Sequence, residues 1–129
     1  MIAVVERDRR LAQRLVTALE ARGCEVRVAH GYRRARTIFR SEQPAALYVS
    51  EMLHRASGGD LLADFERHET LCHLPALVRV SHSDSVFARA MRRGGLQTVE
   101  APLDVEAVAE RLARMERGGR LPRIRAPKS

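Results

Sequence analysis

The sequence predicts one α/β domain built on a doubly wound, five-stranded parallel sheet with helices on both faces. Short apolar runs alternate along the chain with segments whose apolar residues recur at helical spacing. The run from Ala45 to Val49 is continuously apolar, which is typical of a strand buried on both faces of a parallel sheet. This alternation of strand and helix favours parallel strands joined by right-handed crossovers.

The first half of the chain is expected to hold two strands and two helices before this central run. Ile2 to Val5 reads as a buried strand, and a helix over 9–22 follows, with Asp8 as its N-cap and Gly23 at its end. Residues 24–28 alternate between apolar and charged side chains, which indicates a half-exposed edge strand. The apolar positions of the second helix, which ends before Pro44, are Tyr32, Ala35, Ile38 and Phe39.

The second half should supply the remaining three helices and two strands. A third helix is expected over 59–68, a fourth strand over 76–80 and a fifth strand over 96–100. Ser83 or Asp84 should cap the fourth helix. Its expected apolar positions are Val86, Phe87, Ala90 and Met91, and those of the last helix are Val105, Val108, Leu112 and Met115. The half-polar second strand suits an edge, which favours the flavodoxin-like strand order 2-1-3-4-5.

Composition excludes several classes of protein. No apolar run approaches the roughly 20 residues of a membrane helix, and the N-terminus shows no signal-peptide pattern, so we expect a cytoplasmic protein with no membrane partner. Cys24 and Cys72 lie in no metal-spaced pair. The formal net charge is +7, but five basic residues and no acid occur from position 117 onward. We therefore expect a nearly balanced domain over 1–117 and a basic disordered tail or linker over 118–129.

Four pairs of residues lie at the carboxyl ends of the expected strands: Glu6-Arg7, Ser50-Glu51, Val80-Ser81 and Ala101-Pro102. With Val4 to Asp8, Pro44 to Leu62, Leu74-Pro75, Gly94 and Ala101 to Asp104, they resemble the bacterial response-regulator receiver family. The resemblance covers 1–117. It implies a domain that takes a phosphoryl group from a histidine kinase onto an aspartate, with Mg²⁺ held by two acids after the first strand and with a hydroxyl and a lysine nearby.

The resemblance also implies where each of these functional positions falls in this chain. The acid pair falls on Glu6 and Arg7, and the acceptor position on Ser50. The hydroxyl, lysine and aromatic-switch positions fall on Val80, Ala101 and Thr98.

This set predicts a degenerate phosphorylation pocket, made of Glu6, Arg7, Ser50, Val80 and Ala101. A hydroxyl needs an activating base that a carboxylate does not, and none is evident beside Ser50. Arg7 would place a cation at a metal-ligand position, where like unit charges about 4 Å apart repel by about 4 kcal/mol. We therefore expect no catalytic residue, no metal, no cofactor and no enzyme activity. Arg7 should fill the pocket, paired with Glu6, Glu51 or Asp8.

The leading functional hypothesis is a pseudo-receiver that binds other signalling proteins without phosphorylation, with homodimerisation left open. Its expected interaction face comprises Arg89, Arg92, Arg93, Thr98, Glu106, Glu110 and Arg111. One alternative is nucleic-acid or anionic-surface binding through the basic tail, although the tail lacks aromatic residues and a recognition motif, so nucleic acid is not the expected partner. Another is an active phosphorelay receiver that uses Glu51.

Arg79 provides a test of the strand register. If Val80 and Ala101 both face the old pocket, side-chain alternation sends Arg79 and Glu100 together to the opposite face. The sequence therefore predicts an Arg79–Glu100 ion pair across the fourth and fifth strands.

Overall fold

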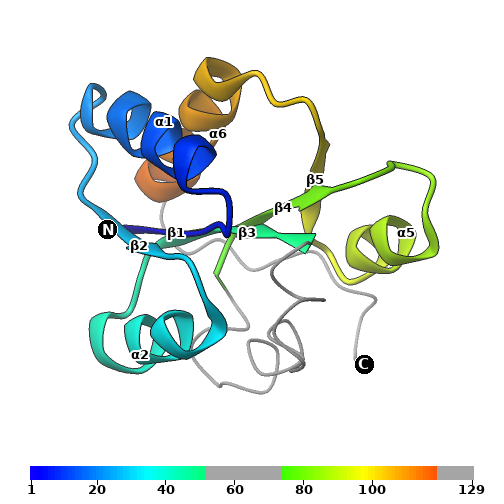
Figure 1. The fold of residues 1–129 in the computed structure, drawn as a ribbon, viewed down its shortest axis with the longest axis horizontal. Coiled ribbons are helices and arrows are strands. Elements are labelled where there is room, and N and C mark those ends of the chain that lie inside the picture. The colour runs from blue at the N-terminus through cyan, green and yellow to red at the C-terminus, as the bar shows by residue number, and fades with distance from the viewer. Residues whose placement is uncertain (52–73, 119–129) are drawn as a thin grey trace.

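A five-stranded parallel sheet forms the centre of the computed structural model, which describes residues 1–51 and 74–118. Its strands are β1 (Ile2–Val5), β2 (Val26–Ala29), β3 (Ala46–Ser50), β4 (Ala76–Val80) and β5 (Gln97–Glu100). They lie in the order β2-β1-β3-β4-β5 (Figure 1). The predicted fold class and strand order are confirmed, and the half-exposed second strand lies at an edge.

Helices cover both faces of the sheet (Figure 1). One face packs against α1 (Arg9–Glu20) and α6 (Val105–Arg117). The other face packs against α2 (Tyr32–Glu42) and α5 (Val86–Arg93). The helix expected over 59–68 lies outside the described residues. No helix in the described part of the chain is long and apolar enough to cross a membrane.

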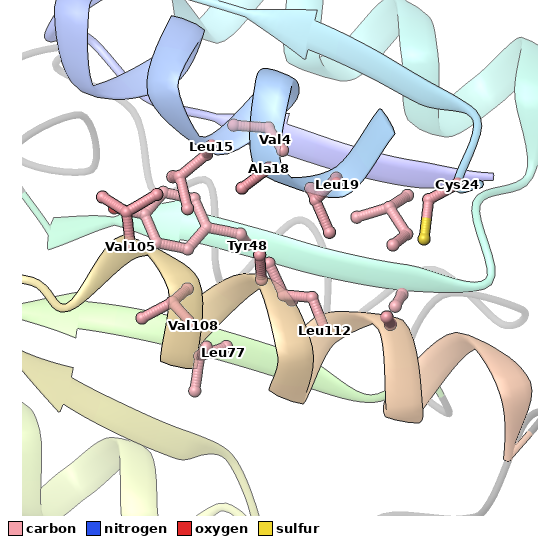
Figure 2. Packing of buried hydrophobic residues seen from close by; sticks show 14 of the residues in the cluster. Val4, Leu15, Ala18, Leu19, Cys24, Tyr48, Leu77, Val105, Val108 and Leu112 are labelled. Carbon is pink, nitrogen blue, oxygen red and sulfur yellow. The ribbon is translucent and has the colours of Figure 1, made fainter. Parts of the chain in front are cut away.

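The α1/α6 face buries a layer in which alternate residues of three central strands meet the two helices (Figure 2). Val4, Tyr48 and Leu77 project from the sheet toward apolar residues of α1 and α6. Tyr48 is fully buried, and it is the one residue of this layer on β3 that carries a polar tip. A buried phenol needs a hydrogen-bond partner. The partner of Tyr48 lies at the carboxyl end of the sheet.

The opposite face takes the residues between these positions, as the pleat of a strand requires. Val5, Val49, Val78 and Val80 pack there with apolar side chains of α2 and α5. Val80 thus belongs to the core on this side of the sheet, with a side chain 1% exposed.

The start of α5 differs from the prediction. Ser85, rather than Ser83 or Asp84, is the N-cap, and its Oγ accepts a hydrogen bond from the backbone N–H of Ala88 at 3.0 Å. Moving the cap places Val86 in the first turn on the outer face, where it is 73% exposed instead of buried. The first helix also ends earlier than expected, at Glu20, and the chain turns at Gly23 with a left-handed φ of 81° that glycine adopts at little cost.

Candidate functional site

The strand register brings four polar side chains to one face at the carboxyl end of the sheet. Val4 lies opposite Tyr48, and Ser50 lies opposite Arg79. Since side chains two residues apart share a face, Tyr48, Ser50 and Arg79 all lie on the α1/α6 side. Glu6 follows Val4 by two residues, just past the end of β1, and joins them.

Glu6 is the centre of the resulting network. Its carboxylate is 0% exposed, and each oxygen accepts two hydrogen bonds. Oε1 accepts from the Tyr48 hydroxyl at 2.7 Å and from Arg79 Nε at 3.0 Å. Oε2 accepts from Arg79 Nη2 at 3.0 Å and from the Asp8 backbone N–H at 3.1 Å. The Arg79–Glu6 contact is therefore a bidentate, charge-assisted ion pair, which is among the strong forms of hydrogen bonding in proteins.

Arg79 ties this pair to the third strand. Its Nη2 also donates to Ser50 Oγ at 2.9 Å, and its Nε lies 3.2 Å from the Tyr48 hydroxyl. The Arg79 side chain is 15% exposed, and Ser50 is fully buried. The guanidinium therefore occupies the space between the ends of β1 and β3, which the sequence analysis assigned to the phosphorylation pocket.

The surroundings of Arg79 and Tyr48 keep both side chains protonated, so that both can donate hydrogen bonds to Glu6. Burial by itself lowers the pKa of Arg79, but hydrogen bonding to Glu6 and the charge of Glu6 outweigh that effect and raise it. Burial, followed by the charge and hydrogen bond of Glu6, raises the pKa of Tyr48. Arg79 thus stays cationic and Tyr48 stays a neutral hydroxyl, so the carboxylate keeps its donors.

Arg7 lies outside this network. It is exposed and makes no hydrogen bond or ion pair with the part of the chain that the structure describes. The expectation that Arg7 fills the pocket is wrong: its side chain is exposed between the end of β1 and the start of α1, whereas Glu6 before it is buried. Arg79 supplies the cation instead. Asp8 caps α1 by accepting from the backbone N–H groups of Arg10 and Leu11 at 3.0 and 3.1 Å.

The register of β4 and β5 overturns the predicted Arg79–Glu100 pair. Arg79 lies opposite Val99, and Val80 lies opposite Glu100 rather than Ala101. Glu100 consequently stays at the rim, 44% exposed, with His82 Nδ1 at 4.0 Å. Val80 enters the opposite core layer, and Ala101 is exposed beyond the end of β5. Of the five expected pocket residues, the structure brings only Glu6 and Ser50 together.

Sequence reasoning missed Tyr48 and Arg79 as members of this site. The signal for Tyr48 was present, since it precedes Ser50 by two residues and must share its face. The odd charge of Arg79 inside a strand was also visible, but the face it occupies depended on a register that was off by one residue at β5.

Comparison with known proteins was made at the level of sequence and of structure. The sequence matches no protein-family model, and no curated protein matches it. Solved structures do match. The receiver domain of NtrX from Brucella abortus superposes with a TM-score of 0.76 at 19% identity, covering 91% of this chain and 98% of that one. The receiver domain of a Francisella response regulator gives 0.76 at 17% identity, covering 91% and 96%.

A third match, the signal receiver domain of a histidine kinase from Syntrophus aciditrophicus, gives a TM-score of 0.76 at 19% identity and covers 91% of this chain and 89% of that one. The chain has the receiver fold. The polar network around Glu6 therefore lies at the rim of a receiver-type sheet, at the carboxyl ends of β1, β3 and β4.

The receiver fold implies a Mg²⁺ ion at this rim, and the residues present do not fit one. Both oxygens of Glu6 already accept hydrogen bonds from Arg79, a permanent cation. The carboxylate of Asp8 caps α1, and Glu51, 1% exposed, accepts from the Ser81 backbone N–H at 2.9 Å. Residues 1–51 and 74–118 contain no group of three His, Cys, Asp or Glu side chains placed to hold a metal ion.

The residues of the expected interaction face are spread over α5, β5 and α6. Arg89 and Arg93 are exposed on α5, and Arg92 donates to Thr98 Oγ1 at 3.1 Å across to β5. Glu106 and Glu110 pair instead with Arg22, in the turn after α1, at 3.0 and 3.5 Å. A groove of about 430 Å³ remains between β5 and α6, and Thr98 and Arg111 are among its lining residues.

Proposed function

We propose that this chain belongs to the response-regulator receiver family and acts in bacterial signal transduction as a phosphorylation-independent module that binds other proteins. The observation that carries the proposal is the buried Arg79–Glu6 pair, with its two contacts at 3.0 Å. It fills the space in which phosphoryl transfer would require a metal ion and an exposed acceptor.

The geometry around Ser50 also opposes phosphorylation. Its hydroxyl is fully buried and accepts from Arg79. To attack a phosphoryl donor, the hydroxyl would need a base within hydrogen-bond reach. The carboxylate of this network belongs to Glu6, and its oxygens already accept hydrogen bonds from Tyr48, Arg79 and the Asp8 backbone.

Glu51 is a poor substitute acceptor. Its side chain is 1% exposed, and Oε1 accepts from the Ser81 backbone N–H at 2.9 Å. A phosphoryl donor in solution could reach this carboxylate only if the Glu51 side chain became exposed to solvent. An active phosphorelay through Glu51 is therefore the weaker alternative.

Acetyl phosphate with Mg²⁺ tests the proposal. Intact-protein mass spectrometry should show no added phosphoryl group on the wild-type chain, while a phosphorylatable receiver domain treated in parallel gains one. Ser50→Asp should also stay unmodified, because Arg79 would pair with the new carboxylate as it does with Glu6. A stoichiometric phosphoryl adduct on the wild-type chain would contradict the proposal.

The α5–β5–α6 edge is the surface we propose for partner binding. It combines the exposed Arg89 and Arg93 with the groove between β5 and α6. Charge reversal by Arg89→Glu and Arg93→Glu should remove partners captured from the host lysate by the wild-type chain. The matched reversal Arg9→Glu and Arg14→Glu on α1 should retain them. If the α1 variant loses the partners and the α5 variant retains them, the docking surface lies elsewhere.

A further inference from the structure

The outer face of α2 is strongly basic. Its eleven residues, YRRARTIFRSE, contain four arginines and one glutamate. Arg33, Arg34 and Arg40 are exposed. Arg33 and Arg40 are two helical turns apart and lie on one stripe about 10 Å long. Between them, Arg36 lies over the ring of Tyr32, 5.6 Å from its centroid.

Arg33, Arg34 and Arg40 are not neutralised within the described structure. The only carboxylate on α2 belongs to Glu42, which forms an ion pair with Arg27 of the neighbouring strand β2 at 2.7 Å. Among residues 1–51 and 74–118, no carboxylate forms an ion pair with Arg33, Arg34 or Arg40. The face therefore presents uncompensated positive charge to solvent.

Helix stability does not account for this pattern. Arg33 and Arg34 lie in the first turn, where the helix dipole is positive and disfavours cations. That turn contains no acidic residue, and the N-cap is Gly31, which has no side chain to cap the helix. The positive charge of this turn therefore does not stabilise the helix.

The chemistry of the face points to phosphate. Besides the arginines, the exposed residues of α2 are Thr37 and Ser41, and none is apolar. The centre of a protein interface is depleted of charged residues, and a helix that binds a membrane surface needs an apolar side to insert. The hydroxyls of Thr37 and Ser41 already donate to helix carbonyls, at 3.2 and 2.6 Å. Only guanidinium donors are left for a partner, and guanidinium matches phosphate geometry.

We propose that α2 binds the phosphodiester backbone of nucleic acid, independently of base sequence, through Arg33, Arg34 and Arg40. A shallow depression of about 330 Å³, lined by Tyr32, Arg33, Arg36, Thr37 and Arg40, marks the contact. This inference does not depend on the proposed receiver function. It also differs from the tail hypothesis, because it assigns the contact to the folded domain.

Fluorescence anisotropy of a labelled duplex DNA, titrated with the full chain at several salt concentrations, tests the assignment. Three phosphate contacts contribute about −2.7 to the slope of log K against log salt, which is roughly a 40-fold loss of affinity from 50 to 200 mM. The variant R33Q/R34Q/R40Q should lose about that much slope and most of its affinity. Its circular dichroism spectrum should match the wild type.

Two variants with the same charge change serve as controls: R9Q/R10Q/R14Q on α1, where all three arginines are exposed, and R120Q/R123Q/R125Q in the tail. Both should keep the wild-type slope. No binding by the wild type, an equal loss in all three variants, or a loss confined to the tail variant would overturn the proposal. So would binding to vesicles of anionic phospholipid or to polyglutamate that matches the binding to DNA.

Discussion

The two halves of the sheet's carboxyl rim are built in opposite ways. At the ends of β1, β3 and β4, Glu6, Ser50 and Arg79 are buried or nearly so and joined by hydrogen bonds of 2.9–3.0 Å. At the end of β5, Glu100 and Ala101 are exposed, and the shortest ion-pair contact of Glu100 is 4.0 Å, to His82. The same receiver fold thus closes one half of its rim and leaves the other half open.

The difference lies in which face of the sheet each side chain enters. Arg79 shares a face with Ser50, so its guanidinium reaches the carboxylate of Glu6 under the cover of α1 and α6. Val80, one residue later, enters the other core layer. A single residue of register therefore decides whether a charge in β4 closes the pocket or enters the core layer on the α2/α5 face.

Breaking the closed half should have the largest effect on stability. Arg79→Ala leaves Glu6 buried without its cation, which should lower the free energy of unfolding by about 3–5 kcal/mol. Arg89→Ala, which removes an exposed arginine from α5, should change it by less than about 0.5 kcal/mol. Chemical denaturation of both variants measures the contrast. Similar values for the two would show that the Arg79–Glu6 pair does not hold the rim closed.

Tyr48→Phe should have a smaller effect that depends on pH. The Tyr48 hydroxyl donates to the buried carboxylate at 2.7 Å, and losing such a bond costs about 1.5–3 kcal/mol near neutral pH. The pKa of Tyr48 is raised in the folded state, so above its ordinary value of about 10 the unfolded chain releases a proton that the folded chain keeps. The wild type should then lose stability relative to Tyr48→Phe, by up to about 1.4 kcal/mol per pH unit. If the difference in free energy of unfolding between the wild type and Tyr48→Phe did not change across this pH range, Tyr48 would not be a buried, neutral side chain.

A substitution in the open half of the rim should have little effect on the free energy of unfolding. Glu100→Ala removes a rim carboxylate that is 44% exposed and 4.0 Å from His82. Its cost should stay below about 1 kcal/mol. A cost comparable to that of Arg79→Ala would mean that Glu100 has the buried cationic partner that the sequence analysis first assigned to it.

The fold could be predicted from the sequence because its signals are local. Apolar runs set the strands, and the half-polar pattern of 24–28 placed β2 at the edge. The site was harder, because it depends on register and direction. Glu6 and Ser50 were found by their positions after strands, whereas Arg7 was assigned to the pocket because the family resemblance places a metal-ligand position there. Arg79 was recognised as unusual, but its partner could be found only once β4 was aligned with β3 and β5.

Mg²⁺ binding tests the closed rim most directly. Titration of the wild-type chain, followed by isothermal calorimetry and by amide chemical shifts at residues 6–8, 50 and 79, should give no saturable signal, because Arg79 holds both oxygens of Glu6. The shifts should change only gradually and without a plateau as the concentration of the salt rises. Saturable Mg²⁺ binding with a dissociation constant below about 1 mM, within the range that protein oxygen sites reach, would contradict the account, because it would require Glu6 to release Arg79.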